Sequence, residues 1–221
     1  MSQEIIHVYL MPGMAASPLI FEHIRLPENK FKVHKLKWFL PKKEEPLPSY
    51  ASRMTKEIKH KNVVLLGVSF GGVLVQEMCK YIDVRKLIIV SSVKSKDELP
   101  AHMQIAKTTK LYKLLPTNLA SRVDLLAKYA YGDNIKKRLN LYKMYLSVSD
   151  RQYLDWAIEN MLNWDQEAYH PHIVHIHGDK DHVFPIKNIS NPIVLKNGTH
   201  AMIIYKYRWF NDNLPEIILK G

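Results

Sequence analysis

Three short segments carry side chains that together could perform nucleophilic catalysis. Ser69 stands in GVSFGG, Asp181 in HGDKDH and His200 in NGTH. A serine hydroxyl is nearly inert at neutral pH. It becomes a nucleophile when a base takes its proton, a third group orients that base, and hydrogen-bond donors stabilise the oxyanion that forms. The three segments supply a serine for the nucleophile, a histidine for the base and an aspartate for the group that orients the base.

The residues around Ser69 predict a strand, a sharp turn and a helix. An apolar run, NVVLL, precedes the serine, and VLVQEMCKYI, which has apolar residues at helical spacing, follows it. Gly67 and Gly71 stand where a side chain would collide with crowded backbone. This context favours a nucleophile at the apex of the turn over the alternative, a glycine-rich turn with an incidental serine.

Six short runs rich in β-branched residues predict the strands that position these segments. They span residues 5–10, 31–39, 62–67, 86–92, 172–178 and 191–196. Helical patterns lie between most of them, so we expect an α/β fold with a doubly wound parallel sheet. Loops after the carboxyl ends of parallel strands gather at one edge of a sheet, and Ser69, Asp181 and His200 are expected to meet there.

The alternation stops between residues 94 and 170, where four helical patterns follow one another, at 102–115, 119–131, 135–146 and 151–162. We predict a single domain, 1–221, with a four-helix cap at 94–170 inserted before the penultimate strand. Apolar and aromatic side chains of the cap could line a pocket or simply bury the cap against the sheet. These side chains are Leu114, Leu115, Leu126, Tyr142, Tyr145, Trp156, Met161 and Trp164.

Over nearly its whole length the chain resembles the α/β-hydrolase superfamily. GVSFGG resembles the nucleophile elbow, HGDKDHVFP the acid loop and NGTHAMI the histidine loop, in that superfamily's order. The resemblance implies that Ser69 is the nucleophile, His200 the base and then the acid, and Asp181 the group that orients His200. Asp179 is the rival acid. The family's spacing of three residues after Gly178 favours Asp181 and leaves Asp179 to structure the turn.

The resemblance also implies an oxyanion hole of two backbone N–H groups, those of Phe70 and Met14. Many members have His-Gly in the loop after the first strand, whereas this chain has Pro12-Gly13. A backbone donor does not need the histidine side chain, so the hole is still expected. Gly13, Gly67 and Gly71 are the structural glycines of this loop and the elbow. Ser17 either reaches the pocket or caps a turn.

A second interpretation makes HIHGDKDH a metal site, with ligands His175, His177, Asp179, Asp181 and His182. Lys180 interrupts the run, and only His200 follows as a further histidine, which counts against this interpretation. We therefore expect neither a metal nor an organic cofactor.

The remaining features exclude several partner classes. The 32 lysines and arginines exceed the 21 acids to give a formal charge of +11, but they are scattered among acids, so no nucleic-acid partner is expected. A single cysteine, Cys79, and the absence of a signal segment or long apolar run predict a cytoplasmic protein that is not inserted in a membrane.

The expected function is that of a serine hydrolase, like a carboxylesterase or thioesterase, cleaving an ester or related acyl bond of a small apolar molecule. The same residues also serve amide hydrolysis and carbon–carbon cleavage. The alternative is a ligand-binding protein that retains the hydrolase fold without its activity.

Overall fold

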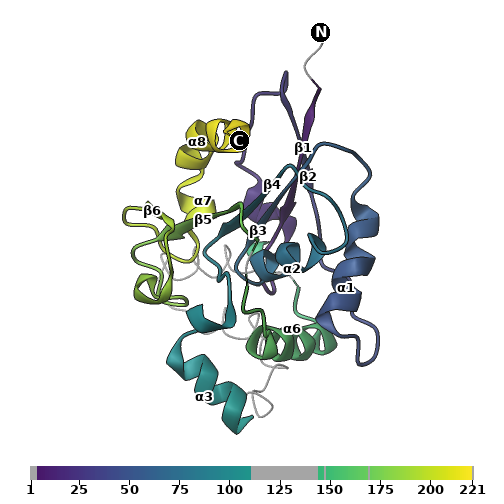
Figure 1. Ribbon diagram of the computed structural model, residues 1–221, viewed down its shortest axis with the longest axis vertical. Helices are drawn as coiled ribbons and strands as arrows, with labels where there is room; N and C mark the ends of the chain where they lie inside the picture. The colour runs from purple at the N-terminus through teal and green to yellow at the C-terminus, as the bar shows by residue number, and fades with distance from the viewer. Residues whose placement is uncertain (1–3, 111–143, 147, 169, 221) are drawn as a thin grey trace.

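The computed structural model describes residues 4–110, 144–146, 148–168 and 170–220 (Figure 1). Its strands form one sheet of six, in the order β2-β1-β3-β4-β5-β6, and every neighbouring pair is parallel. The strands are β1 (Ile6–Met11), β2 (Phe31–Lys35), β3 (Val63–Val68), β4 (Lys86–Val90), β5 (Ile173–Gly178) and β6 (Ile193–Leu195). The predicted parallel sheet of six strands is confirmed.

The edge strand that differs most from its prediction is β2. The edge strand β2 ends at Lys35, whereas the apolar pattern continues to Phe39. The later residues leave the sheet because Trp38 is buried among Tyr50, Phe70 and Tyr153. The segment after Lys35 therefore packs its aromatic residue into the core, although its composition is typical of a strand.

Helices cover both faces of the sheet (Figure 1). One core contains α1 (Leu47–Met54), α2 (Phe70–Met78) and α6 (Arg151–Asn163), and the other contains η1 (Pro18–Phe21), α7 (Met202–Tyr205) and α8 (Tyr207–Leu219). Leu65 belongs to the first core, and its neighbours Val64 and Leu66 belong to the second. Central strands are thus buried on both faces, which explains why VVLL is apolar without interruption.

Short connecting helices complete the described chain. They are η2 (Thr55–Glu57), η3 (Lys96–Glu98), α3 (Ala101–Thr109) and η6 (Ile186–Asn188). Not one of the described helices has the length and apolar character needed to cross a membrane.

Two of the four predicted cap helices are described. α3 covers the described part of the 102–115 prediction and ends at Thr109, after which Lys110 is left-handed with φ 57°. α6 matches the 151–162 prediction. The 119–131 helix and most of the 135–146 helix lie outside the described residues. α3 and α6 contact each other, and α6 also contacts α2, which begins at the carboxyl edge of the sheet (Figure 1). The extent of the cap, 94–170, stays a prediction.

Several side chains considered for the pocket wall have other contacts. The indole N–H of Trp156 donates to the carbonyl oxygen of Glu45 at 2.6 Å, and its ring packs on Tyr50 at 4.4 Å. The indole of Trp164 donates to Glu77 at 2.8 Å, and Tyr145 bonds to Glu22. Four other candidates for the pocket wall lie outside the described residues, namely Leu114, Leu115, Leu126 and Tyr142. Trp156 therefore anchors α6 to the core and does not form the cavity wall.

Replacing Trp156 by alanine should accordingly destabilise the fold. Loss of a buried indole and its hydrogen bond is expected to cost about 3–5 kcal/mol of unfolding free energy, measured by urea denaturation. Arg151→Ala is the control on the same helix, because its contact with Asp155 is an exposed ion pair. It should change stability by less than about 0.5 kcal/mol. Equal losses in both variants would contradict the anchoring role.

Candidate active site

Ser69 stands at a sharp turn between β3 and α2. Its backbone is in a sparsely populated conformation, φ 52° and ψ −124°, which costs a non-glycine residue roughly 1–3 kcal/mol. Its N–H donates to Val90 O at 2.9 Å. Its carbonyl oxygen accepts from Gly72 N at 2.8 Å and from Ser92 Oγ at 2.7 Å. These bonds offset the strain and hold the side chain at the turn's apex.

Close backbone contacts explain the glycines. A Cβ on Gly67 would lie 2.2 Å from Gly71 O, and a Cβ on Gly71 would lie 2.3 Å from the carbonyl oxygen of Pro12. A Cβ on Gly13 would be 3.2 Å from Ser69 Cβ. The loop after β1 is thus packed directly on the serine turn.

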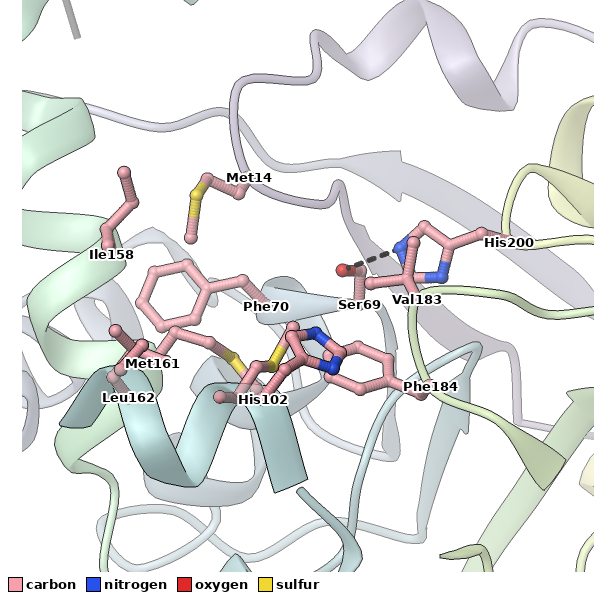
Figure 2. A pocket seen from close by; sticks show the side chains of 12 residues that line it. Met14, Ser69, Phe70, His102, Ile158, Met161, Leu162, Val183, Phe184 and His200 are labelled. Atoms are coloured by element: carbon pink, nitrogen blue, oxygen red, sulfur yellow. Dashed lines mark hydrogen bonds between the residues drawn. The ribbon is translucent and has the colours of Figure 1, made fainter. Parts of the chain in front are cut away.

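The structure brings Ser69, His200 and Asp181 into one hydrogen-bonded chain (Figure 2). Ser69 Oγ lies 3.0 Å from His200 Nε2. His200 Nδ1 lies 2.9 Å from Asp181 Oδ2 and 3.1 Å from Oδ1. Because the carboxylate only accepts, Nδ1 carries the proton and Nε2 can accept the serine's proton. This is the arrangement that a serine nucleophile requires.

Asp181 is held as an anion by its surroundings. Its side chain is fully buried, and Oδ1 accepts from the backbone N–H groups of Val183 at 2.9 Å and Phe184 at 3.0 Å. Burial alone would raise the pKa of Asp181. The hydrogen bond and charge of His200, together with the N–H of Phe184, outweigh burial and lower the pKa.

Asp179 has no comparable contact. Its backbone N–H donates to Leu195 O at 3.4 Å, and its Oδ1 is buried without a hydrogen-bond partner among the described residues. The geometry therefore places Asp181, and not Asp179, against the histidine.

Two buried histidines of β5 lie behind the acid. His177 Nε2 donates to Phe184 O at 2.8 Å, and its Nδ1 then accepts from His175 Nε2 at 3.1 Å. Burial lowers the pKa of His175 to about 3 and also lowers that of His177, so both rings are neutral at neutral pH. With Asp179, Asp181 and His182 they do not converge into a metal-binding group within the described part of the chain.

The two residues expected to supply the oxyanion donors, Met14 and Phe70, line the same cavity as Ser69. Phe70 is the first residue of α2, where backbone N–H groups lack helical partners. Met14 lines the cavity beside it (Figure 2). Trp38 supports the loop from behind, donating from Nε1 to Gly13 O at 2.8 Å and stacking on Phe70 at 5.3 Å. Ser17 instead caps η1, accepting from Leu19 N at 3.2 Å.

An apolar cavity of about 480 Å³ opens on Ser69. In Figure 2 the serine and His200 lie at one end, and Ile158 and Leu162 of α6 lie at the other. The remaining wall is mainly thioether, aromatic and aliphatic. It consists of Met14, Phe70, His102, Met103, Ala106, Met161, Val183 and Phe184.

Sequence reasoning missed several residues that support this site. Trp38, Phe184 and His177 are far from Ser69 in sequence. No motif includes Trp38, and the acid-loop motif HGDKDHVFP contains His177 and Phe184 without assigning either a supporting role. Trp38 ends an apolar run, and His177 lies on a strand directly before the acid loop. The positions of Trp38 and His177 in the sequence were only a weak signal of a supporting role, because only the fold shows which residues touch the site.

No protein-family model and no curated protein matches this sequence. Solved structures do match. The chain is 13% identical to a carboxylesterase structure from Nitrososphaera gargenis, with 97% of this chain and 90% of that one covered and a TM-score of 0.70. The chain is 16% identical to a bromoperoxidase from Bacillus anthracis, with 99% of this chain and 93% of that one covered and a TM-score of 0.68. It is 17% identical to an esterase from Exiguobacterium antarcticum, with 100% of this chain and 94% of that one covered and a TM-score of 0.62. These likenesses, with the parallel sheet covered on both faces, show that the chain has the α/β-hydrolase fold.

Proposed function

We propose that this protein is a serine hydrolase that cleaves an ester, or a related acyl bond, of a small apolar substrate. The observation that carries the proposal is the hydrogen-bonded chain from Ser69 through His200 to Asp181, open to an apolar cavity. Structural neighbours that include esterases support a hydrolytic reaction on this fold.

In the first half of the reaction, Ser69 Oγ attacks the acyl carbonyl carbon while His200 Nε2 takes its proton. Asp181 stabilises the resulting imidazolium through Nδ1. The carbonyl oxygen becomes an oxyanion and accepts hydrogen bonds from the N–H groups of Met14 and Phe70. The tetrahedral intermediate then collapses, and the alcohol leaves with the proton from His200.

In the second half, a water molecule attacks the acyl-serine. His200 takes one proton from that water and returns it to Ser69 Oγ as the acid leaves. All proton transfers pass through one nitrogen, Nε2. No metal or organic cofactor enters these steps.

The cavity wall favours an apolar acyl group. It offers few polar atoms besides those of Ser69, His102 and His200, so a charged substrate would lose hydration without compensation. Each buried methylene of an acyl chain contributes about 0.8 kcal/mol. An aliphatic ester or thioester therefore suits the site better than a peptide or sugar.

Labelling with a fluorophosphonate probe tests the nucleophile. Ser69 should be modified, and Ser69→Ala and His200→Ala should each lower kcat for p-nitrophenyl esters on the order of 10⁶-fold, with the double variant hardly worse. Ser17→Ala is the matched control, because that hydroxyl caps η1, and it should keep both labelling and activity. Undiminished labelling of Ser69→Ala would refute the assignment. Lack of turnover despite ligand binding would favour the binding-protein alternative.

Exchanging each aspartate for asparagine tests the orienting group. Asp181→Asn should lower kcat about 10⁴-fold, because an amide N–H facing Nδ1 imposes the wrong tautomer of His200. Asp179→Asn should affect mainly stability, since that side chain does not reach the histidine. Stopped-flow or steady-state kinetics with urea denaturation separates the two effects. The reverse pattern would mean that the acid is Asp179.

The far wall of the cavity should determine acyl chain length. Ile158→Trp fills that end and should cost about fourfold in kcat/KM for each methylene it displaces, so octanoate esters suffer while acetate esters do not. Ile105→Trp is the matched control on α3, where the side chain is 60% exposed and outside the cavity lining. Probe labelling should persist in both variants. An equal loss for short and long esters in Ile158→Trp would contradict the assigned wall.

A further inference from the structure

Three histidines gather away from the active site, on the face of the sheet that α1 and α2 cover. His7 lies near the start of β1, His34 lies on β2, and His60 lies in the connection that precedes β3. In the strand register, Tyr9 is opposite His34, so the side chains of His7, Tyr9 and His34 share one face. Ser69 follows the carboxyl end of β3, whereas His60 precedes the start of that strand.

The three rings are in direct contact. His7 stacks on His60 with ring centroids 3.8 Å apart, and His34 lies 4.7 Å from His60. His7 Nδ1 and His34 Nε2 are 2.9 Å apart and share a proton. One ring nitrogen from each residue can be chosen so that all three atoms lie within 4.8 Å of one another. Around a tetrahedral ion with Zn–N bonds of 2.0–2.1 Å, ligand atoms are about 3.3 Å apart. Small side-chain rotations would therefore make the cluster a ligand set.

Tyr9 orients the exposed member of the cluster. Its Oη lies 2.6 Å from His60 Nδ1 and also accepts the backbone N–H of Lys59 at 3.0 Å. With its proton on Nδ1, His60 donates to Tyr9 and presents the lone pair of Nε2. Metal-binding histidines are usually oriented in this way by an acceptor behind the ring.

From this geometry we propose that His7, His34 and His60 form a binding site for one divalent transition-metal ion of the zinc type. Three imidazoles and no carboxylate suit zinc, copper, nickel and cobalt, and do not suit magnesium or calcium, which prefer oxygen ligands. Water completes the coordination, because His60 is exposed. As the ion binds, the proton between His7 and His34 moves to another ring nitrogen, which frees both ligand atoms.

The ion would act as a brace and not as a catalyst. It would join the edge strand β2 to β1 and to the connection before β3, three segments that are separate in sequence. Lys32 is a positive neighbour of both His7 and His34, and Glu4 is a negative neighbour of His7. The bonds between the imidazoles and the metal must therefore supply the affinity against the charge of Lys32.

Zinc titration of the untagged full-length chain, after chelator treatment, tests the site. Calorimetry should give one high-affinity ion per chain, and Co²⁺ in its place should give the visible absorption of a tetrahedral centre. His34→Asn and His60→Asn should each weaken binding at least tenfold, and Tyr9→Phe, which removes only the acceptor behind His60, about tenfold. Zinc should raise the Tm of the wild type but not that of His34→Asn.

His172→Asn is the matched control, because that histidine is exposed and remote from the cluster, and it should bind zinc like the wild type. Circular dichroism and probe labelling of Ser69 verify that each variant is folded. Absence of stoichiometric binding to the wild type would overturn the proposal. So would affinity that is unchanged in both His34→Asn and His60→Asn, since the ion would then occupy other histidines.

Discussion

Gly71 lies so close to the loop after β1 that a methyl group on it would stand 2.3 Å from the carbonyl oxygen of Pro12. This contact locks the loop that carries Met14 against the helix that begins at Phe70. The spacing of the two proposed oxyanion donors is therefore set by packed backbone, which cannot adjust without moving a strand or a helix. The strained serine conformation is maintained by the same packing.

A second close approach assembles the other half of the site. A Cβ on Gly178 would lie 2.2 Å from Gly198 O, and Lys180 N donates to the same oxygen at 2.9 Å. The acid loop after β5 and the histidine loop after β6 are thus joined through backbone. Asp181 and His200 meet because these loops touch, and the carboxylate is then fixed by Val183 and Phe184. Rigid placement of this kind is what proton transfer over one hydrogen bond requires.

Aromatic residues connect the cavity at Ser69 to α6. Phe70 lines the cavity, stacks on Trp38 and meets the edge of Trp156 on α6. α6 therefore rests on the same rings that support the loop after β1, while its Ile158 and Leu162 line the cavity beside Ser69. The proposed reaction and the proposed metal brace use different residues of one sheet, since Ser69 follows β3 whereas the histidines lie on β1, on β2 and before β3, so each can be tested without disabling the other.

The sequence by itself determined the strands, their parallel arrangement and the three segments that carry Ser69, Asp181 and His200, because periodicity and local turn chemistry are written in neighbouring residues. The tertiary structure decided what depends on distant contacts. It placed Asp181 rather than Asp179 against His200, ended β2 at Lys35 to bury Trp38, and turned Trp156 into the core. It also brought His7, His34 and His60 together. These three histidines are far apart along the chain, and they become neighbours through the pairing of β1 with β2 and the position of the connection before β3.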